Sequence, residues 1–337
     1  MVVQKTEPEQ AELIAQLRKE LGDKHSGLDD EYLRQFLIAR SWNVTAAKEQ
    51  LESTLDWRKE NKIDLYPVAT NDNKLPLLYP VRGFSSISDG NVTGGPGVAE
   101  SVLRIYRWMG GSCLHKTDVD GCPVYIERLG YHCAKELAKN TTSEEIAQYH
   151  IGCNEFLHRV VMADCTKKAN KVINRETVIF DCTGMGWHQF HMPAIYFIRA
   201  ISDIDQKYYP ETLNKLYLVN APSAFVMVWK IVKGWLDPGT IEKIQILGKD
   251  YKDVLLKQIP AENLPTFLGG ECTCSHMPGG CVPSQVLKSI PVIEAKEHNE
   301  KSRFAYNEDI MQKAESDPLL RTGPSHNNNN TLTNGQS

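Results

Sequence analysis

The chain has 337 residues, of which 41% are hydrophobic and 24% charged, and its formal net charge is −4. These values are ordinary for a globular protein and give no global reason to bind nucleic acid or an anionic membrane. The N-terminal residues lack the apolar core of a signal peptide, and the nine cysteines are irregularly spaced, which fits reduced thiols better than a disulfide framework. We therefore expect a cytoplasmic protein.

The first part of the chain predicts a small group of helices. Apolar residues recur at helical spacing up to Leu21. Asp29 then begins a second helix, which reaches Arg40, and Asn43 caps a third, which ends near residue 61. Two segments follow from this pattern: residues 1–26, an N-terminal helical extension, and residues 27–75, an N-terminal helical lobe.

Residues 76–112 predict a linker between this lobe and the rest of the chain. The segment from Ser85 to Gly97, with the sequence SSISDGNVTGGPG, has the composition of a flexible insertion. No strand precedes its glycines and no Gly-Lys-Ser or Gly-Lys-Thr follows them, so they do not predict a phosphate-binding loop.

From about residue 113 onward, predicted strands alternate with predicted helices. The strands are expected at 123–129, 177–181, 216–219 and 244–247, and the helices at 142–168 and 189–204. This alternation predicts an α/β fold with a mostly parallel sheet for a domain at 113–283. Apolar periodicity then fades, and we expect residues 284–337 to form a C-terminal extension with a disordered, asparagine-rich tail.

The segment 225–236 has large apolar residues on every side of a helical wheel. It is too short to cross a bilayer, which needs about 20 residues. One interpretation is a lid, with one face over an apolar cavity and the other against a membrane. The alternative is a fully buried core helix, which Lys230 and Lys233 disfavour because lysines are almost never fully buried without a partner.

Several patterns that carry chemistry in other proteins are incomplete here. Cys133 follows a histidine, as in cysteine phosphatases, but Lys139 stands where their arginine is expected. His188 and His191, three residues apart on a predicted helix, could share a metal, yet no third ligand stands beside them. We therefore predict no catalytic residue, and keep an enzyme based on Cys133 or on a metal at these histidines as an alternative.

A second candidate metal site lies near the end of the predicted domain. Cys272, Cys274, His276 and Cys281 are ligand types that zinc accepts. Their spacing departs from the usual gap of two to four residues between paired cysteines, so the sequence does not predict a metal ion there.

Four polar residues could together bind a lipid phosphate and its hydroxyl groups. Arg40 ends the second predicted helix, Glu211 begins a strand, and Thr240 and Lys243 lie one turn apart after the apolar segment. Such a ligand needs cationic donors, a hydroxyl group and an acceptor at one place. The alternative is that these residues form ordinary surface salt bridges.

With these residues in view, the chain resembles the CRAL-TRIO lipid-transfer family, and within it the phosphatidylinositol transfer proteins of the secretory pathway. The resemblance covers roughly residues 29–281. It rests on the following sequence motifs: DxxLxxFLxAR at 30–40, HKTDxDGxPVY at 115–125, YYPE at 208–211, NAP at 220–222, LDPxT at 236–240 and QIPAENLP at 258–265.

The resemblance implies a helical lobe beside a sheet that forms the floor of an apolar lipid pocket, closed by a gate helix. It implies that phosphatidylinositol is extracted, transferred between membranes and presented to a phosphatidylinositol kinase, by a monomer on Golgi or endosomal membranes. It implies neither a cofactor nor a nucleic-acid partner. The headgroup would be bound by Arg40, Glu211, Thr240 and Lys243. The gate residues would be Phe225, Val228, Trp229, Val232, Lys233 and Trp235, of which Phe225, Trp229, Lys233 and Trp235 would meet the bilayer.

The residues that hold phosphatidylcholine in such proteins are largely replaced. In place of tyrosines, a serine and a threonine, the matching positions are Leu114, Asn154, Glu176 and Val178, and an arginine is replaced by Thr212. Tyr125 is retained. We therefore expect a pocket lined by these six residues that takes phosphatidylinositol and a second hydrophobic lipid ligand other than phosphatidylcholine. The alternative is a carrier of another hydrophobic molecule.

Overall fold

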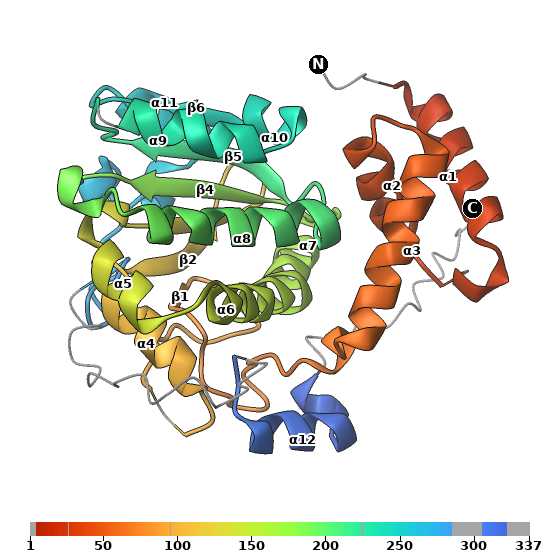
Figure 1. The fold of residues 1–337 in the computed structure, drawn as a ribbon, viewed down its shortest axis with the longest axis horizontal. Helices are drawn as coiled ribbons and strands as arrows, with labels where there is room; N and C mark the ends of the chain where they lie inside the picture. The colour runs from red at the N-terminus through yellow and green to blue at the C-terminus, as the bar shows by residue number, and fades with distance from the viewer. Residues whose placement is uncertain (1–4, 26, 95, 224, 285–304, 322–337) are drawn as a thin grey trace, which may run out of the picture.

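The computed structural model describes residues 5–25, 27–94, 96–223, 225–284 and 305–321. Three helices form an N-terminal lobe beside the main body (Figure 1), packed around Leu17, Leu33 and Phe36. Asp29 caps the second helix at the Tyr32 N–H, and Asn43 caps the third at the Ala46 N–H. The three helices are α1 (Glu7–Leu21), α2 (Asp30–Ala39) and α3 (Val44–Glu60).

The main body contains a six-stranded sheet in the order β1 to β6. Strands β2 and β3 are antiparallel, and every other neighbouring pair is parallel, which confirms the predicted α/β class. The strands are β1 (Val81–Arg82), β2 (Ser112–Thr117), β3 (Pro123–Glu127), β4 (Glu176–Asp181), β5 (Leu213–Val219) and β6 (Ile244–Ile246).

Helices pack on the sheet, with α6 and α8 crossing in front of it in the view of Figure 1. The predicted long helix at 142–168 is one continuous helical run, in which a π-helix (Leu157–Met162) joins α6 to α7. The remaining helices of the described residues are α4 (Glu100–Trp108), α5 (Ala134–Asn140), α6 (Ser143–Phe156), α7 (Ala163–Ala169), α8 (Met192–Tyr208), α9 (Phe225–Val232), α10 (Pro238–Glu242), α11 (Lys252–Gln258) and α12 (Glu308–Ser316). Short 3-10 turns lie at Asp23–His25, Ile63–Leu65, Leu129–Tyr131, Trp187–Gln189, Lys233–Trp235, Ala261–Asn263, Thr266–Leu268 and Pro318–Leu320.

The two lobes are joined by buried polar contacts. Arg58 of α3 donates to the Glu155 carboxylate of α6 at 2.9 Å, and Tyr209 donates to the same carboxylate at 2.7 Å. Burial acts against the charge of Glu155, but Arg58 and Arg159 hold its pKa at about 2. Trp57 stacks on Tyr208 with ring centroids 3.9 Å apart. These contacts hold the C-terminal end of α3 against α6 and the end of α8.

The two faces of the sheet bury different sets of side chains, because residues along a strand point alternately to opposite sides. One face turns Tyr125, Val178 and Leu216 toward α6, α8 and α9. The opposite face turns Ile126 and Ile179 toward α11 and the segment that follows it.

The predicted linker contributes structure that its composition did not indicate. It contains β1 and α4, and both Ile87 and Val92 of the predicted flexible insertion are buried in the main core. Arg82 is fully buried and donates to the Gly90 carbonyl at 2.6 Å. The expected disordered tail lies outside the described residues.

Candidate ligand-binding cavity

A cavity of about 800 Å³ lies between the sheet and helices α6, α8 and α9. Its walls are mainly apolar, with Ile195 and Ile201 contributed by α8. The floor consists of alternate residues of β3, β4 and β5, namely Tyr125, Glu127, Glu176, Val178, Phe180, Leu216 and Leu218. The described residues therefore form an apolar cavity of the kind that the sequence predicts, on the face of the sheet that α6, α8 and α9 cover.

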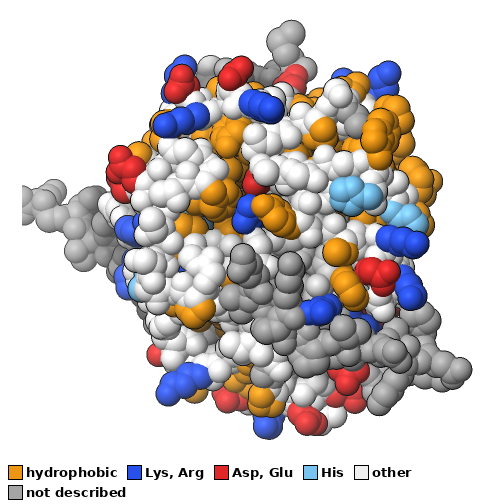
Figure 2. Space-filling model, turned by 90° about the vertical axis from the view of Figure 1, so that its left-hand side faces the viewer, with side chains coloured by type: hydrophobic (Ala, Val, Ile, Leu, Met, Phe, Trp, Pro, Cys, Tyr) orange, Lys and Arg blue, Asp and Glu red, His pale blue; other side chains and the backbone are white. Residues whose placement is uncertain are grey.

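Helix α9 covers part of this cavity and is apolar on both of its sides. Phe225, Val228 and Val232 are buried and line the cavity, whereas Val226 and Met227 are 55% and 59% exposed. The alternative of a fully buried core helix is therefore wrong. Figure 2 shows hydrophobic side chains gathered at the upper right of the side face of the molecule.

The residues at the two ends of α9 differ from the sequence-based assignment. Of the four predicted to meet the bilayer, Phe225 is buried against the cavity and Trp229 is half-buried, while Lys233 is exposed. Trp235 stacks on Tyr196 of α8, with centroids 5.8 Å apart. Neither Lys233 nor Trp235 lines the cavity. The described part of the chain holds no helix of the length and apolarity that crossing a membrane requires.

A polar cluster lies at one side of the cavity. Lys243 Nζ is 2.8 Å from Glu211 Oε2, and Arg175 Nη2 is 3.2 Å from the same oxygen. Burial lowers the pKa of Lys243, against the effect of the Glu211 carboxylate. Arg40 and Thr240 line the same cavity, so all four residues of the predicted headgroup site line one cavity, and their role in binding a headgroup stays a prediction. Arg175 is a member of the cluster that sequence reasoning missed.

Local backbone structure explains how these side chains are presented. Helix α2 ends at Ala39, and the chain then turns through Ser41 and Trp42, both with a left-handed backbone, which leaves Arg40 at the helix end facing the cavity. Glu211 also has a left-handed backbone, with φ of 61°, in the turn between α8 and β5. Such conformations are uncommon for residues other than glycine and persist where surrounding contacts hold them.

A second polar cluster lies deeper in the cavity. His150 Nε2 is 2.7 Å from the Asp205 carboxylate, to which Asn154 also donates at 2.9 Å. Burial lowers the pKa of His150, but Asp205 outweighs that effect and holds it above the ordinary value. Burial, with a contribution from Asp205, raises the pKa of Glu176 to about 8. Sequence reasoning named Asn154 and Glu176 but missed His150 and Asp205.

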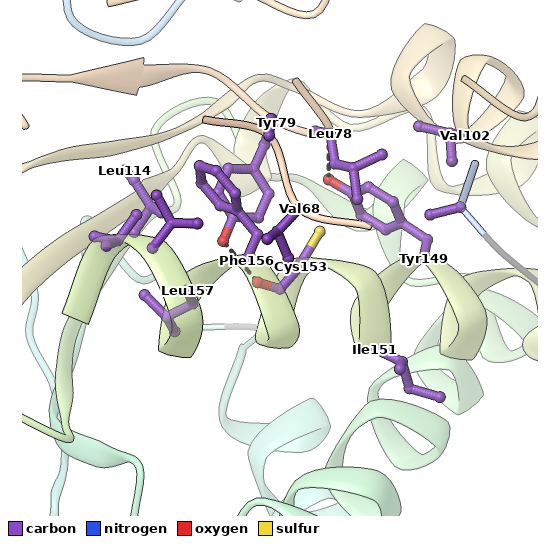
Figure 3. Close-up of a cluster of buried hydrophobic side chains, with 14 of the residues drawn as sticks. Val68, Leu78, Tyr79, Val102, Leu114, Tyr149, Ile151, Cys153, Phe156 and Leu157 are labelled. Carbon is purple, nitrogen blue, oxygen red and sulfur yellow. Dashed lines mark hydrogen bonds between the residues drawn. The ribbon is translucent and has the colours of Figure 1, made fainter. Parts of the chain in front are cut away.

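One of the six predicted pocket residues does not line the cavity. Leu114 is fully buried in the main hydrophobic core, in the cluster with Tyr79 and Phe156 that Figure 3 shows. It lies on the same face of the sheet as Tyr125, its partner in β3, but it packs in the core with Phe156 and Leu157 and not against the cavity. The other five line the cavity, and they are Tyr125, Asn154, Glu176, Val178 and Thr212.

The residues of the alternative enzyme belong to three different elements. Cys133 is an exposed thiol at the start of α5. His188 belongs to the 3-10 turn Trp187–Gln189 and His191 is the N-cap of α8, so the two are not on one helix as predicted. Among the residues that the structure describes, neither histidine belongs to a group that could hold a metal ion.

The raised pKa of Glu176 predicts a pH-dependent stability. Its carboxyl keeps a proton up to about pH 8 in the folded state but releases it near pH 4.5 when unfolded, so the folded protein loses stability as the pH rises between these values. In thermal unfolding scans, the Tm of Glu176→Gln should fall less between pH 5 and pH 8 than that of the wild type, by about 2 °C or more. The exposed Glu12→Gln should match the wild type, and equal slopes for all three proteins would contradict the raised pKa of Glu176.

Comparison with known proteins identifies a family and several relatives to which this chain is similar. Residues 107–270 match the CRAL/TRIO domain family. The chain is 37% identical to the Sec14 cytosolic factor of Schizosaccharomyces pombe over 255 residues, which cover 75% of this chain and 78% of that protein. It is 35% identical to the SEC14 cytosolic factor of Eremothecium gossypii over 277 residues, which cover 81% of this chain and 80% of the relative.

Plant relatives are longer than this chain. The phosphatidylinositol/phosphatidylcholine transfer protein SFH11 of Arabidopsis thaliana is 35% identical over 266 residues, 79% of this chain. The match spans 62% of SFH11 and, in the related SFH9, only 39%. The crystal structure of Sfh5 aligns with a TM-score of 0.47 and 18% identity, covering 74% of this chain and 84% of that one.

Proposed function

The chain belongs to the CRAL-TRIO family of Sec14-related proteins, and from that premise we propose that it binds phosphatidylinositol and transfers it between membranes. The observation that carries the proposal is the combination of a mainly apolar cavity with a cluster of cationic, hydroxyl and carboxylate groups at its side. An apolar cavity alone fits many ligands, whereas this cluster matches a ligand with both a phosphate and hydroxyl groups.

The apolar part of the cavity accounts for the acyl chains. Two chains carry on the order of 30 methylene groups, and each contributes about 0.8 kcal/mol on burial. Exposing both chains to water would therefore cost about 25 kcal/mol, so a carrier must enclose them almost completely. It must also open at a membrane to load them. Helix α9 is the element suited to that opening, because it covers the cavity with Phe225 and Val228 and presents Val226 and Met227 outward.

The polar cluster accounts for the headgroup. In this proposal Lys243, Arg40 and the Thr240 hydroxyl bind the phosphate. Glu211 accepts hydrogen bonds from inositol hydroxyls. Its charge stays compensated when Lys243 turns to the phosphate, because Arg175 remains 3.2 Å away. This second partner lets the cluster exchange one ion pair for another without leaving a buried charge unpaired.

The deeper cluster argues against phosphatidylcholine as the second ligand. Glu176, Asp205 and Glu127 place carboxyl groups in the cavity wall, and the positions that we align with choline-phosphate ligands of relatives include Glu176. The cation of this cluster, His150, is already paired with Asp205, so a phosphate there would have to compete with that carboxylate. We propose a second ligand without a phosphate at that position, and no covalent chemistry on either lipid. Presentation of the bound lipid to a phosphatidylinositol kinase, on Golgi or endosomal membranes and by a monomer, completes the proposal.

Native mass spectrometry tests the proposal directly. The protein is incubated with vesicles that contain phosphatidylinositol, phosphatidylcholine and phosphatidylserine, then isolated and sprayed from a volatile buffer. We expect one phospholipid per chain, predominantly phosphatidylinositol. Phosphatidylcholine in equal amount would overturn the assignment of the deeper cluster, and protein free of lipid after this incubation would overturn the transfer function itself.

A further inference from the structure

Three cysteines and one histidine meet on the face of the sheet opposite to the lipid cavity. Cys272, Cys274 and Cys281 come from the segment after the 3-10 turn Thr266–Leu268, and His115 comes from β2. One ligand atom from each lies within 4.8 Å of the other three. All four side chains are buried, and His115 is completely inaccessible. The cluster is separate from every residue of the proposed lipid site.

The separations match those of a tetrahedral metal centre. His115 Nε2 is 3.3 Å from Cys274 Sγ, and Cys272 Sγ is 3.5 Å from Cys274 Sγ. Zinc bonds of about 2.3 Å to sulfur and about 2.0 Å to nitrogen place tetrahedral ligands roughly 3.5–3.8 Å apart. The Cys272–Cys274 pair already has that spacing, and the other pairs can reach it with shifts of up to about 1 Å.

His115 directs one ring nitrogen at the three thiols. Its Nε2 faces the Cys274 sulfur, so this is the nitrogen that a metal ion in the group would take. A neutral imidazole is a common metal ligand and binds a metal through either ring nitrogen.

The backbone of this segment is folded tightly to return Cys281 to Cys272. Cys274 has a left-handed backbone with φ of 44°, and Gly279 and Gly280 follow with φ of 80° and 67°. The Met277 N–H donates to the Cys274 carbonyl at 2.9 Å, and the Cys281 thiol lies 3.3 Å from the Cys272 carbonyl. The three sulfur atoms are thus brought together by a shaped turn.

We propose that His115, Cys272, Cys274 and Cys281 bind a structural zinc ion. Four protein ligands fill a tetrahedral zinc and leave no position for substrate, and the complete burial of the group agrees with a closed site. The ion would tie the segment after α11 to β2. His276, the histidine in the sequence pattern, is excluded because it is exposed and contacts Asp89 at 2.7 Å instead.

The metal content of the full chain tests this proposal. Purified under reducing conditions without added metal, the wild type should carry about one zinc ion per chain by plasma mass spectrometry. Cys274→Ser and His115→Asn should each retain less than about a fifth of that amount. Cys133→Ser is the matched control, because this exposed thiol lies outside the cluster, and it should keep its full zinc content.

Cobalt binding keeps the test decisive if a variant does not fold. Wild-type protein stripped of metal and supplied with Co²⁺ should show thiolate-to-cobalt absorption and the visible bands of tetrahedral cobalt. Wild type that contains no zinc and gives no such bands would overturn the proposal. Iron in place of zinc, or a disulfide among the three cysteines in freshly prepared protein, would overturn it equally. None of these results depends on whether the cavity binds lipid.

Discussion

Lys243→Ala is expected to weaken phosphatidylinositol binding about 10- to 100-fold, because a buried hydrogen bond to a charged group contributes roughly 1.5–3 kcal/mol. The fold should persist, since Glu211 keeps Arg175 as a partner at 3.2 Å after Lys243 is removed. Binding is measured by titrating the protein with phosphatidylinositol that carries a fluorescent acyl chain. The same chain on a neutral diacylglycerol reports on the apolar cavity alone, and its binding should change less than about threefold.

Lys249→Ala is the matched control for this experiment. Lys249 is an exposed lysine a few residues further along the chain and does not line the cavity. Its replacement removes the same charge from the protein, so any general electrostatic effect on vesicle binding appears in both variants. If Lys243→Ala bound phosphatidylinositol as tightly as Lys249→Ala, the polar cluster would not be the headgroup site.

The sheet was predictable where its strands are apolar and was missed where they are not. Residues 178–180 and 216–219 are continuous apolar runs, which mark buried parallel strands. Strand β2 has the sequence SCLHKT. Its polar residues do not indicate a buried strand, although most of the strand is buried. Helix α4 was missed although Val102, Ile105 and Tyr106 recur at helical spacing, because it is short and follows a glycine-rich segment. Local patterns do not record that such residues find partners in distant segments.

The candidate site, too, was predictable only in part from the sequence. Arg40, Glu211, Thr240 and Lys243 belong to separate segments, and only the docking of the N-terminal lobe and the order of the strands bring them to one cavity. Arg175 escaped notice because it belongs to no motif and joins the cluster through the pairing of β4 with β5.

The cysteine cluster could not be assembled from the sequence for a related reason. The histidine that meets the thiols is not the adjacent His276 but His115, 159 residues away from Cys274 in sequence. Spacing rules for metal ligands describe neighbours in the chain, whereas His115 reaches the three cysteines only through the fold.

Substitutions at two adjacent residues of α9 should affect two different steps: one should affect contact with the membrane, the other enclosure of the lipid. Val226 is 55% exposed, so Val226→Asp leaves the cavity wall intact but places a charge on the surface proposed to enter the bilayer. We expect transfer of phosphatidylinositol between vesicles to slow about tenfold or more, while lipid binding measured by native mass spectrometry stays unchanged. Phe225 faces the cavity, so Phe225→Asp should instead reduce the amount of lipid bound.

Val172→Asp supplies the control, because Val172 is 57% exposed and lies after α7, away from α9. It introduces the same charge at the same exposure, and its transfer rate should equal that of the wild type. Equal rates for Val226→Asp and Val172→Asp would show that the outer side of α9 does not meet the membrane. Slow transfer by Val226→Asp with full lipid occupancy would instead place the loss at the membrane step, because a protein that still encloses its lipid has lost only the contact through which it loads and unloads.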